Sequence, residues 1–277
     1  MKKSRIVEGF PADRVASLYR VPRRFHDRLV TPLADRIPVS TGNFSFDFKI
    51  KRFLRGAPLA TPERHAAWLG SFRADEQRSL LQRPPEDMFG EWRTAYDAAP
   101  TRDGVERLIY AYAKTYLQDD ILVKVDRASM ACSLEVRAPF LDVDLVAFLG
   151  SVPSRLKLHR LDSKHLLKRA MANVLPKGIA ERPKKGFGIP IAEWFKRDLH
   201  EPLHDELSPA RVAAQGIFEP GEVQRLLSEH MTGRRDHRKQ LWTLFVFQLW
   251  HRRWADRVPS ESDSGSSVPG TRSSAAR

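Results

Sequence analysis

The sequence predicts a mainly helical protein. Strand signals are scarce along its 277 residues. Two stretches, 103–117 and 239–254, place apolar side chains near the period of about 3.6 residues that characterises an amphipathic helix. No segment recurs at the period of about 20 to 50 residues that marks a solenoid. A hydrophobic content of 42% is ordinary for a folded core.

The first third of the chain predicts short helices. Residues 14–36 carry apolar side chains near helical spacing, but Pro22 and Pro32 interrupt them, so we expect broken helices there. Three further segments follow: a turn-rich connector at 40–47, a basic segment at 49–55 and a second helical block at 62–82.

The remaining helices are predicted from periodicity and capping residues. A neighbouring helix continues from Asp120 after the amphipathic stretch 103–117. Asp162 and Ser163 are favourable N-cap residues ahead of another apolar repeat, which Pro176 should end. In the last helix, the side chains spaced to bury one face are Leu241, Leu244, Phe245, Gln248 and Leu249.

We expect three consecutive regions: a helical segment at 1–100, a helical region at 101–257 and a tail at 258–277. The tail is rich in Ser, Pro and Gly and holds too few apolar residues to offset its ordering entropy, so it is expected to be disordered.

Charge and cysteine content indicate which kinds of partner and which cellular location to expect. The net charge is +13 and the pI is near 10.1. Basic residues are nevertheless scattered among acidic ones without a zinc-finger, RNP or P-loop pattern, so an Arg-rich solvated surface is favoured over nucleic-acid binding. The single cysteine, Cys132, is expected inside a helix and cannot form an intrachain disulfide. With no signal peptide or spanning segment in evidence, we expect a soluble cytoplasmic protein.

Charged residues inside apolar surroundings are the first candidates for a site. Glu135 and Arg137 precede an apolar run, where an unpaired buried charge would be costly. Buried charges are usually paired, which favours a structural ion pair that fixes the turn at Pro139 over a role in a pocket.

Two lysines point more directly to a phosphate. Lys164 is expected in the first turn of a helix, where the macrodipole disfavours a cation but would favour a bound anion. Lys184 lies in the loop Arg-Pro-Lys-Lys-Gly-Phe-Gly at 182–188, whose glycines allow close backbone approach and whose lysines could meet phosphoryl oxygens. By pattern alone, a solvated basic turn is the commoner explanation of such a loop.

Four linked segments together resemble the signature of glutamine-dependent asparagine synthetases. Their order is Asp-Ile-Leu-Val-Lys-Val-Asp-Arg at 120–127, Glu-Val-Arg-Ala-Pro-Phe-Leu-Asp at 135–142, Ser-Lys-His-Leu-Leu-Lys at 163–168 and Arg-Pro-Lys-Lys-Gly-Phe-Gly-Ile-Pro at 182–190. Weaker similarity extends from about residue 9 to about residue 250. The resemblance is to the carboxyl-terminal part of the synthetase domain.

This resemblance implies a fold and a chemistry. The chain would be the helical portion of an ATP-pyrophosphatase-type α/β domain whose parallel sheet is largely missing. The family adenylates the side-chain carboxylate of aspartate with ATP and Mg²⁺, and ammonia then attacks the acyl-adenylate. By similarity, Lys184 holds the ATP phosphates and steadies developing charge, Lys164 is a second active-site lysine, and Asp120 lies on a helix that lines the pocket. No residue is assigned as a metal ligand.

Several family motifs are absent. The chain begins Met1-Lys2 without the glutaminase cysteine, and it contains neither a Ser-Gly-Gly-x-Asp-Ser loop nor the acidic Gly-Gly-Asp-Glu segment. We therefore expect no glutamine hydrolysis and no catalysis by this chain alone, although the family consists of ATP-dependent carbon–nitrogen ligases.

Alternative explanations stay open at this point. The chain could be a fragment, or half of a split enzyme completed by an upstream polypeptide that carries the ATP loop and the glutaminase. It could instead be a non-catalytic helical module that binds a protein or RNA. The amidated carboxylate could also differ, as in lactam-forming or cell-surface-modifying amidotransferases.

Overall fold

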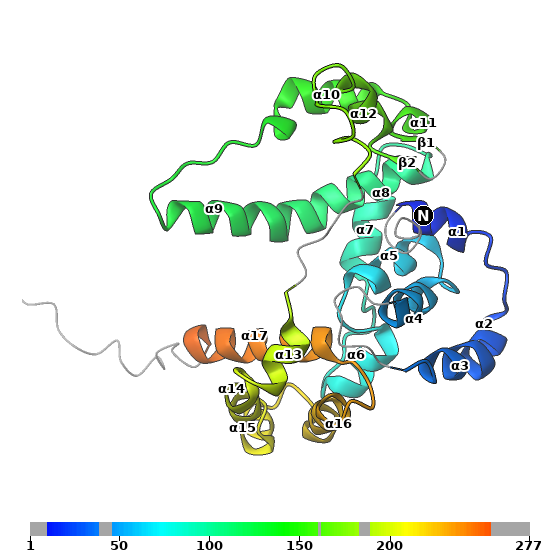
Figure 1. The fold of residues 1–277 in the computed structure, drawn as a ribbon. Helices are drawn as coiled ribbons and strands as arrows, with labels where there is room; N and C mark the ends of the chain where they lie inside the picture. The colour runs from blue at the N-terminus through cyan, green and yellow to red at the C-terminus, as the bar shows by residue number, and fades with distance from the viewer. Residues whose placement is uncertain (1–9, 39–45, 160–161, 183–188, 256–277) are drawn as a thin grey trace, which may run out of the picture.

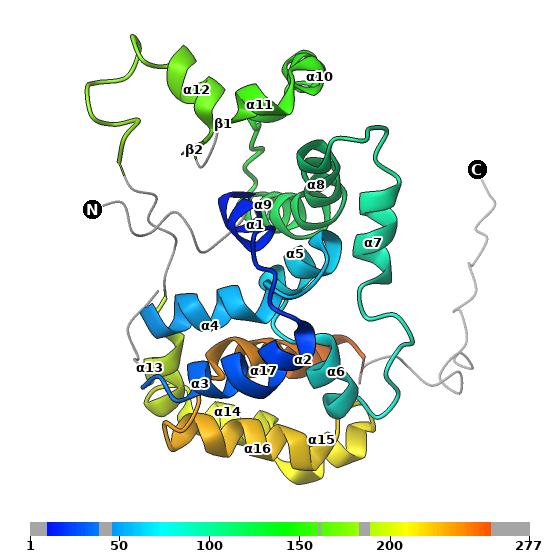
Figure 2. The ribbon, with the colours of Figure 1, turned by 90° about the vertical axis from the view of Figure 1, so that its right-hand side faces the viewer.

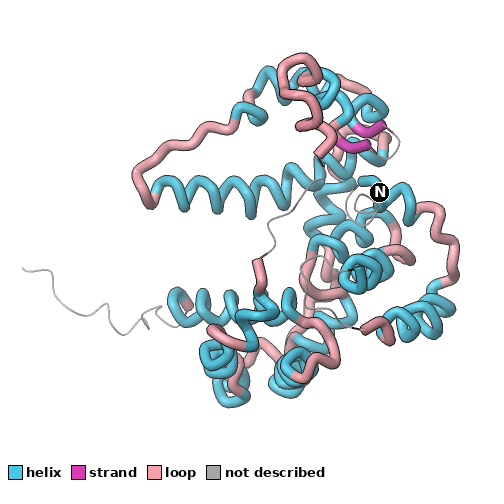
Figure 3. Tube along the Cα trace, viewed as in Figure 1, coloured by secondary structure: helices cyan, strands magenta, loops and turns pink. Residues whose placement is uncertain are grey.

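The computed structural model describes residues 10–38, 46–159, 162–182 and 189–255. It confirms that the protein is mainly helical (Figure 3). The strands in these ranges are β1 (Leu158–His159) and β2 (Asp162–Ser163), which pair antiparallel. Helices α10, α11 and α12 lie together at one end of the molecule, and α13 to α17 lie at the other (Figures 1 and 2). The predicted tail at 258–277 lies outside the described residues.

The amino-terminal third forms short helices, as predicted. They are α1 (Phe10–Ala16), α2 (Arg23–Phe25), the π-helical η1 (His26–Val30), α3 (Thr31–Asp35), α4 (Phe46–Gly56), α5 (Thr61–Leu69), α6 (Ala74–Leu80) and α7 (Gly90–Asp97). The break in 14–36 precedes Pro22, whereas Pro32 is tolerated near the start of α3. The basic segment 49–55 lies within α4, and most of the connector at 40–47 lies outside the described residues.

A long helical run leaves the body of the molecule next. It consists of α8 (Gly104–Tyr112), the π-helical η2 (Ala113–Leu122) and α9 (Val123–Met130), and it projects outward in Figure 1. Asp103 caps α8, because its carboxylate accepts hydrogen bonds from the backbone N–H groups of Val105 and Glu106 at 2.9 and 3.0 Å. Cys132 was expected inside a helix, but it lies just beyond α9 and is exposed.

The chain then returns through an extended stretch to a group of small elements. These are the 3₁₀ helix η3 (Pro139–Leu141), α10 (Val143–Ser151), α11 (Ser154–Lys157), the β1–β2 pair and α12 (His165–Ala170). The predicted cap at Asp162 and Ser163 is wrong. Pairing of Asp162 with His159 and of Ser163 with Leu158 draws both residues into β2, so Lys164 occupies the N-cap position. The helix also ends at Ala170, well before the proline expected to stop it.

The carboxyl-terminal helices are α13 (Ile191–Lys196), α14 (His200–Glu206), α15 (Pro209–Gln215), α16 (Pro220–Met231) and α17 (Arg238–Trp254). The predicted last helix is confirmed. Leu241, Leu244, Phe245 and Gln248 are buried along one side of α17, and Leu249 is partly buried.

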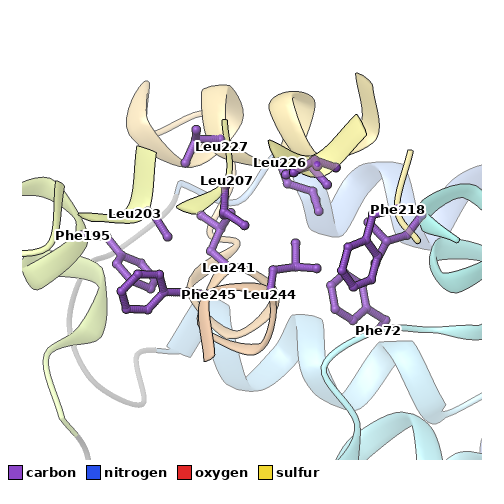
Figure 4. Packing of buried hydrophobic residues seen from close by; sticks show 13 residues of the cluster. Phe72, Phe195, Leu203, Leu207, Phe218, Leu226, Leu227, Leu241, Leu244 and Phe245 are labelled. Carbon is purple, nitrogen blue, oxygen red and sulfur yellow. The ribbon is translucent and has the colours of Figure 1, made fainter. Parts of the chain in front are cut away.

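The largest core joins segments that are far apart in the sequence. Phe72 and Leu80, from the α6 region, pack with side chains of α13 to α17 (Figure 4). The carboxyl-terminal members of this cluster are Phe195, Leu203, Leu207, Val212, Phe218, Val223, Leu226, Leu227, Leu241, Leu244 and Phe245. Two smaller clusters hold α5 against α7 and α8, and α1 against Trp68. In the described part of 113–190, Leu158 is the only buried residue.

Candidate functional site

Asp120 lies on the π-helical segment η2, on the helix that the resemblance assigns to the pocket. Its side chain is exposed, and Lys124, one turn further along, places Nζ 3.6 Å from Asp120 Oδ1. Water screens such a surface pair strongly, so the carboxylate can exchange this partner for a ligand at little cost.

Lys164 lies at a corner between β2 and α12. Its backbone adopts the left-handed conformation, with φ 59° and ψ 30°, which is unfavourable for a residue with a Cβ. The side chain is exposed, and its ammonium has no hydrogen bond or ion pair with any residue in the described ranges. Strain of this kind persists where the surrounding structure imposes it, and it is concentrated at functional sites.

Asp162 organises the charges around this corner. It accepts a short hydrogen bond from Lys168 Nζ, and its other oxygen lies 3.4 Å from His165 Nδ1. Asp162 therefore pairs with Lys168, whereas no described residue pairs with the ammonium of Lys164. Sequence reasoning missed this role and assigned Asp162 to a helix cap. The available signal was the regular spacing of Asp162, His165 and Lys168, three residues apart in the sequence.

Glu135 and Arg137 form an ion pair, with 2.6 Å between Glu135 Oε1 and an Arg137 side-chain nitrogen. Their expected burial is wrong, because the side chains are 69% and 86% exposed. The apolar neighbours Leu134, Val136 and Phe140 are exposed as well, so this stretch does not form the dry environment that the sequence suggested.

Among the described residues, no direct bond joins the proposed site residues into one cluster. Lys184 lies outside the described residues. Within the described ranges, no hydrogen bond or ion pair links Asp120 to Lys164 or either of them to the Glu135–Arg137 pair. In the same ranges, no group of three or more His, Cys, Asp or Glu side chains is placed to hold a metal ion.

Comparison with known proteins decides the family. The asparagine synthase family model matches residues 15–252, a range that includes every one of the proposed site residues. The chain belongs to the asparagine synthase family. No solved structure matches it, so the ATP-pyrophosphatase-type architecture stays a prediction.

Curated members of the asparagine synthase family are similar to this chain over part of their length. A putative glutamine-hydrolysing asparagine synthetase of Mycobacterium bovis is 32% identical over 254 residues, which cover 89% of this chain and 39% of that protein. Asparagine synthetase 1 of Bacillus subtilis is 29% identical over 159 residues, covering 57% of this chain and 25% of that protein. The Gallus gallus asparagine synthetase is 30% identical over 152 residues, covering 50% and 26%.

The chain thus spans well under half the length of these relatives. None of the described helices is both long and apolar enough to cross a membrane.

Proposed function

We propose that this chain forms part of the active site of an ATP-dependent asparagine synthase, which amidates aspartate through an acyl-adenylate. The observation that carries the proposal is the family match over 15–252, which spans all four motif segments. The relatives are named as glutamine-hydrolysing asparagine synthetases. Because the chain covers only a fraction of them, the complete reaction requires the remaining part of such an enzyme.

In this proposal the two lysines bind the phosphates of ATP. The ammonium of Lys164 is exposed and is not neutralised by Asp162, which engages Lys168. A compact cation of this kind suits a phosphoryl oxygen. Lys184 is assigned to the same phosphates and would stabilise the negative charge that grows on them as pyrophosphate leaves.

The other residues position the substrates. Asp120, whose carboxylate is paired among the described residues only with the exposed Lys124, would orient a cationic group or a lysine of the site. Mg²⁺ bound to ATP would offset phosphate charge, and we assign no ligand for it within the described residues. We place the protein in the cytoplasm, where its lone exposed Cys132 stays a thiol.

The test is pyrophosphate release with ATP, aspartate and ammonia. It uses the purified chain alone and then mixed with the polypeptide encoded immediately upstream. We expect release only in the mixture, and at least a hundredfold loss in Lys184→Ala and in Lys164→Ala, because each removes a charge that stabilises the transition state, a loss on the order of 3 kcal/mol.

Lys177→Ala is the matched control. Lys177 is also an exposed lysine of the same region, and its loss should leave the rate within twofold. Equal losses in all three variants would indicate a general effect of net charge and would contradict the assigned roles. Absence of pyrophosphate release in the mixture would refute the proposed function.

A further inference from the structure

Residues 134–138 have the character of a β-strand, but they pair with no strand in the described part of the chain. They run Leu-Glu-Val-Arg-Ala, an alternation of apolar and charged side chains with the two-residue period of a strand. They belong to no helix or strand, and Ala138 has the extended dihedrals φ −102° and ψ 100°. In Figure 3 this stretch is part of the long loop that returns from α9.

Side-chain contacts agree with an extended backbone. In a strand, residues two apart point to the same face, and Glu135 and Arg137 form their 2.6 Å ion pair in that way. The same geometry directs Leu134 and Val136 to the opposite face, where they are 59% and 51% exposed. One face is therefore apolar and uncovered, and the other is charged and internally paired.

The backbone of the segment also lacks ladder partners among the described residues. Leu134 donates to Ser129 and Ala138 accepts from Leu141, both within the segment's own turns, but Glu135, Val136 and Arg137 make no backbone hydrogen bond with the residues described here. The described part of the chain offers only the β1–β2 pair, whose strands are two residues long. Within the described residues, therefore, no other strand is available to pair with this segment.

We propose that residues 134–138 add as a strand to an open sheet edge in the part of the synthetase that this chain does not span. The inference rests on the proposed function. The chain covers 39% of its mycobacterial relative, so most of that protein has no counterpart here and can supply the sheet. Backbone hydrogen bonds then give affinity, and Leu134 and Val136 give the register.

The charge of the region selects a protein surface over a nucleic acid. From 130 to 148 the sequence carries three carboxylates, at Glu135, Asp142 and Asp144, and one cation, Arg137. This acidic stretch lies in a chain of net charge +13, and it would repel phosphates. The partner surface is accordingly apolar at its centre and neutral or basic at its rim.

The test measures binding and hydrogen exchange with the intact chain and the polypeptide encoded immediately upstream as the probe. Leu134→Asp should weaken the complex at least tenfold, because it places a charge on the buried face of the added strand. The matched control is Leu29→Asp, the same substitution at a leucine that is 54% exposed on η1, and it should change the dissociation constant less than twofold. Amide exchange at 135–137 should slow at least a hundredfold in the complex.

The outcomes separate the two proposals. A complex with protected amides at 135–137 but without pyrophosphate release supports the added strand and refutes the proposed function. Pyrophosphate release that Leu134→Asp leaves unchanged refutes the added strand alone. The inference would be overturned if the two polypeptides failed to bind or if both variants weakened the complex equally. It would also be overturned if the amides at 135–137 were protected in the chain alone at high concentration, which would identify a second copy of the chain as the occupant.

Discussion

The buried histidine of α16 makes the stability of the protein depend on pH. His230 is 3% exposed, and burial lowers its pKa from 6.5 to about 4 although Asp236 opposes this effect. Lys196, His237 and Arg238 add to the lowering. His230 Nδ1 accepts a hydrogen bond from the backbone N–H of His237 at 3.2 Å, so the neutral ring is the form that fits the fold.

The sign and size of the effect follow from linkage. Because the folded-state pKa is lower than the unfolded-state value, the unfolded chain binds the proton more tightly. The stability is therefore fully present above the unfolded pKa of 6.5 and is lost as the pH falls from there towards 4. With these two values, His230 should cost the protein about 2 kcal/mol of unfolding free energy between pH 7 and pH 5.

The assay is urea unfolding at pH 7 and pH 5 at constant ionic strength. His230→Asn keeps an oxygen that can accept from the His237 N–H but cannot titrate, so its loss between the two pH values should be smaller than that of wild type by about 2 kcal/mol. Two other buried or partly buried histidines, His26 and His204, also have lowered pKa values, so the comparison uses the difference between variants. His159→Asn, at an exposed histidine, should keep the wild-type difference. An unchanged pH dependence in His230→Asn would refute the reasoning.

Three further predictions concern the fold and the corner at Lys164. Gly56→Ala should lower the unfolding free energy by about 1–3 kcal/mol, because a methyl group there would come within 2.8 Å of Trp68 Cε2. The control Gly150→Ala, whose added methyl group would meet nothing within 4 Å, should not destabilise the protein. Equal effects of the two substitutions in urea titration would contradict this reasoning. Asp103→Ala should lower the unfolding free energy by about 1 kcal/mol through loss of the α8 cap, and Asp103→Asn should lower it much less. An unchanged unfolding free energy in the alanine variant would exclude the cap as a stabilising contact. Lys164→Gly should have a higher urea midpoint than Lys164→Ala, because glycine relieves about 1 kcal/mol of strain in the left-handed backbone conformation. Both variants should abolish pyrophosphate release. Identical midpoints would show that the backbone at residue 164 is unstrained.

Much of the helical prediction rested on patterns among residues that are close together in the sequence. The periodicity of 103–117 and of 239–254 identified α8 and α17, because an amphipathic pattern depends only on neighbours within a few turns. Helices α13 to α16 were not assigned. Most of them are six or seven residues long, too short for a period to be read, and their stability comes from packing around α17.

For the candidate site, too, some features could be predicted from the sequence and others could not. The order of the four motifs was enough to indicate the family, and the family match confirms it. The roles of Lys184, Lys164 and Asp120 stay predictions, and Lys184 lies outside the described residues. The exposure of Glu135 and Arg137 was mispredicted, because apolar neighbours in sequence indicate burial only when another element covers them.

The sequence by itself determined the helical class, the family and the identity of the candidate phosphate-binding lysines, since these depend on short-range pattern and on linked motifs. Only the tertiary structure decided which distant segments share a core, such as Phe72 with Phe245. It also decided that strand pairing places Lys164 at a left-handed corner and that residues 134–138 pair with no strand among the described residues. These features depend on contacts between residues far apart along the chain, whose free energy no local pattern records.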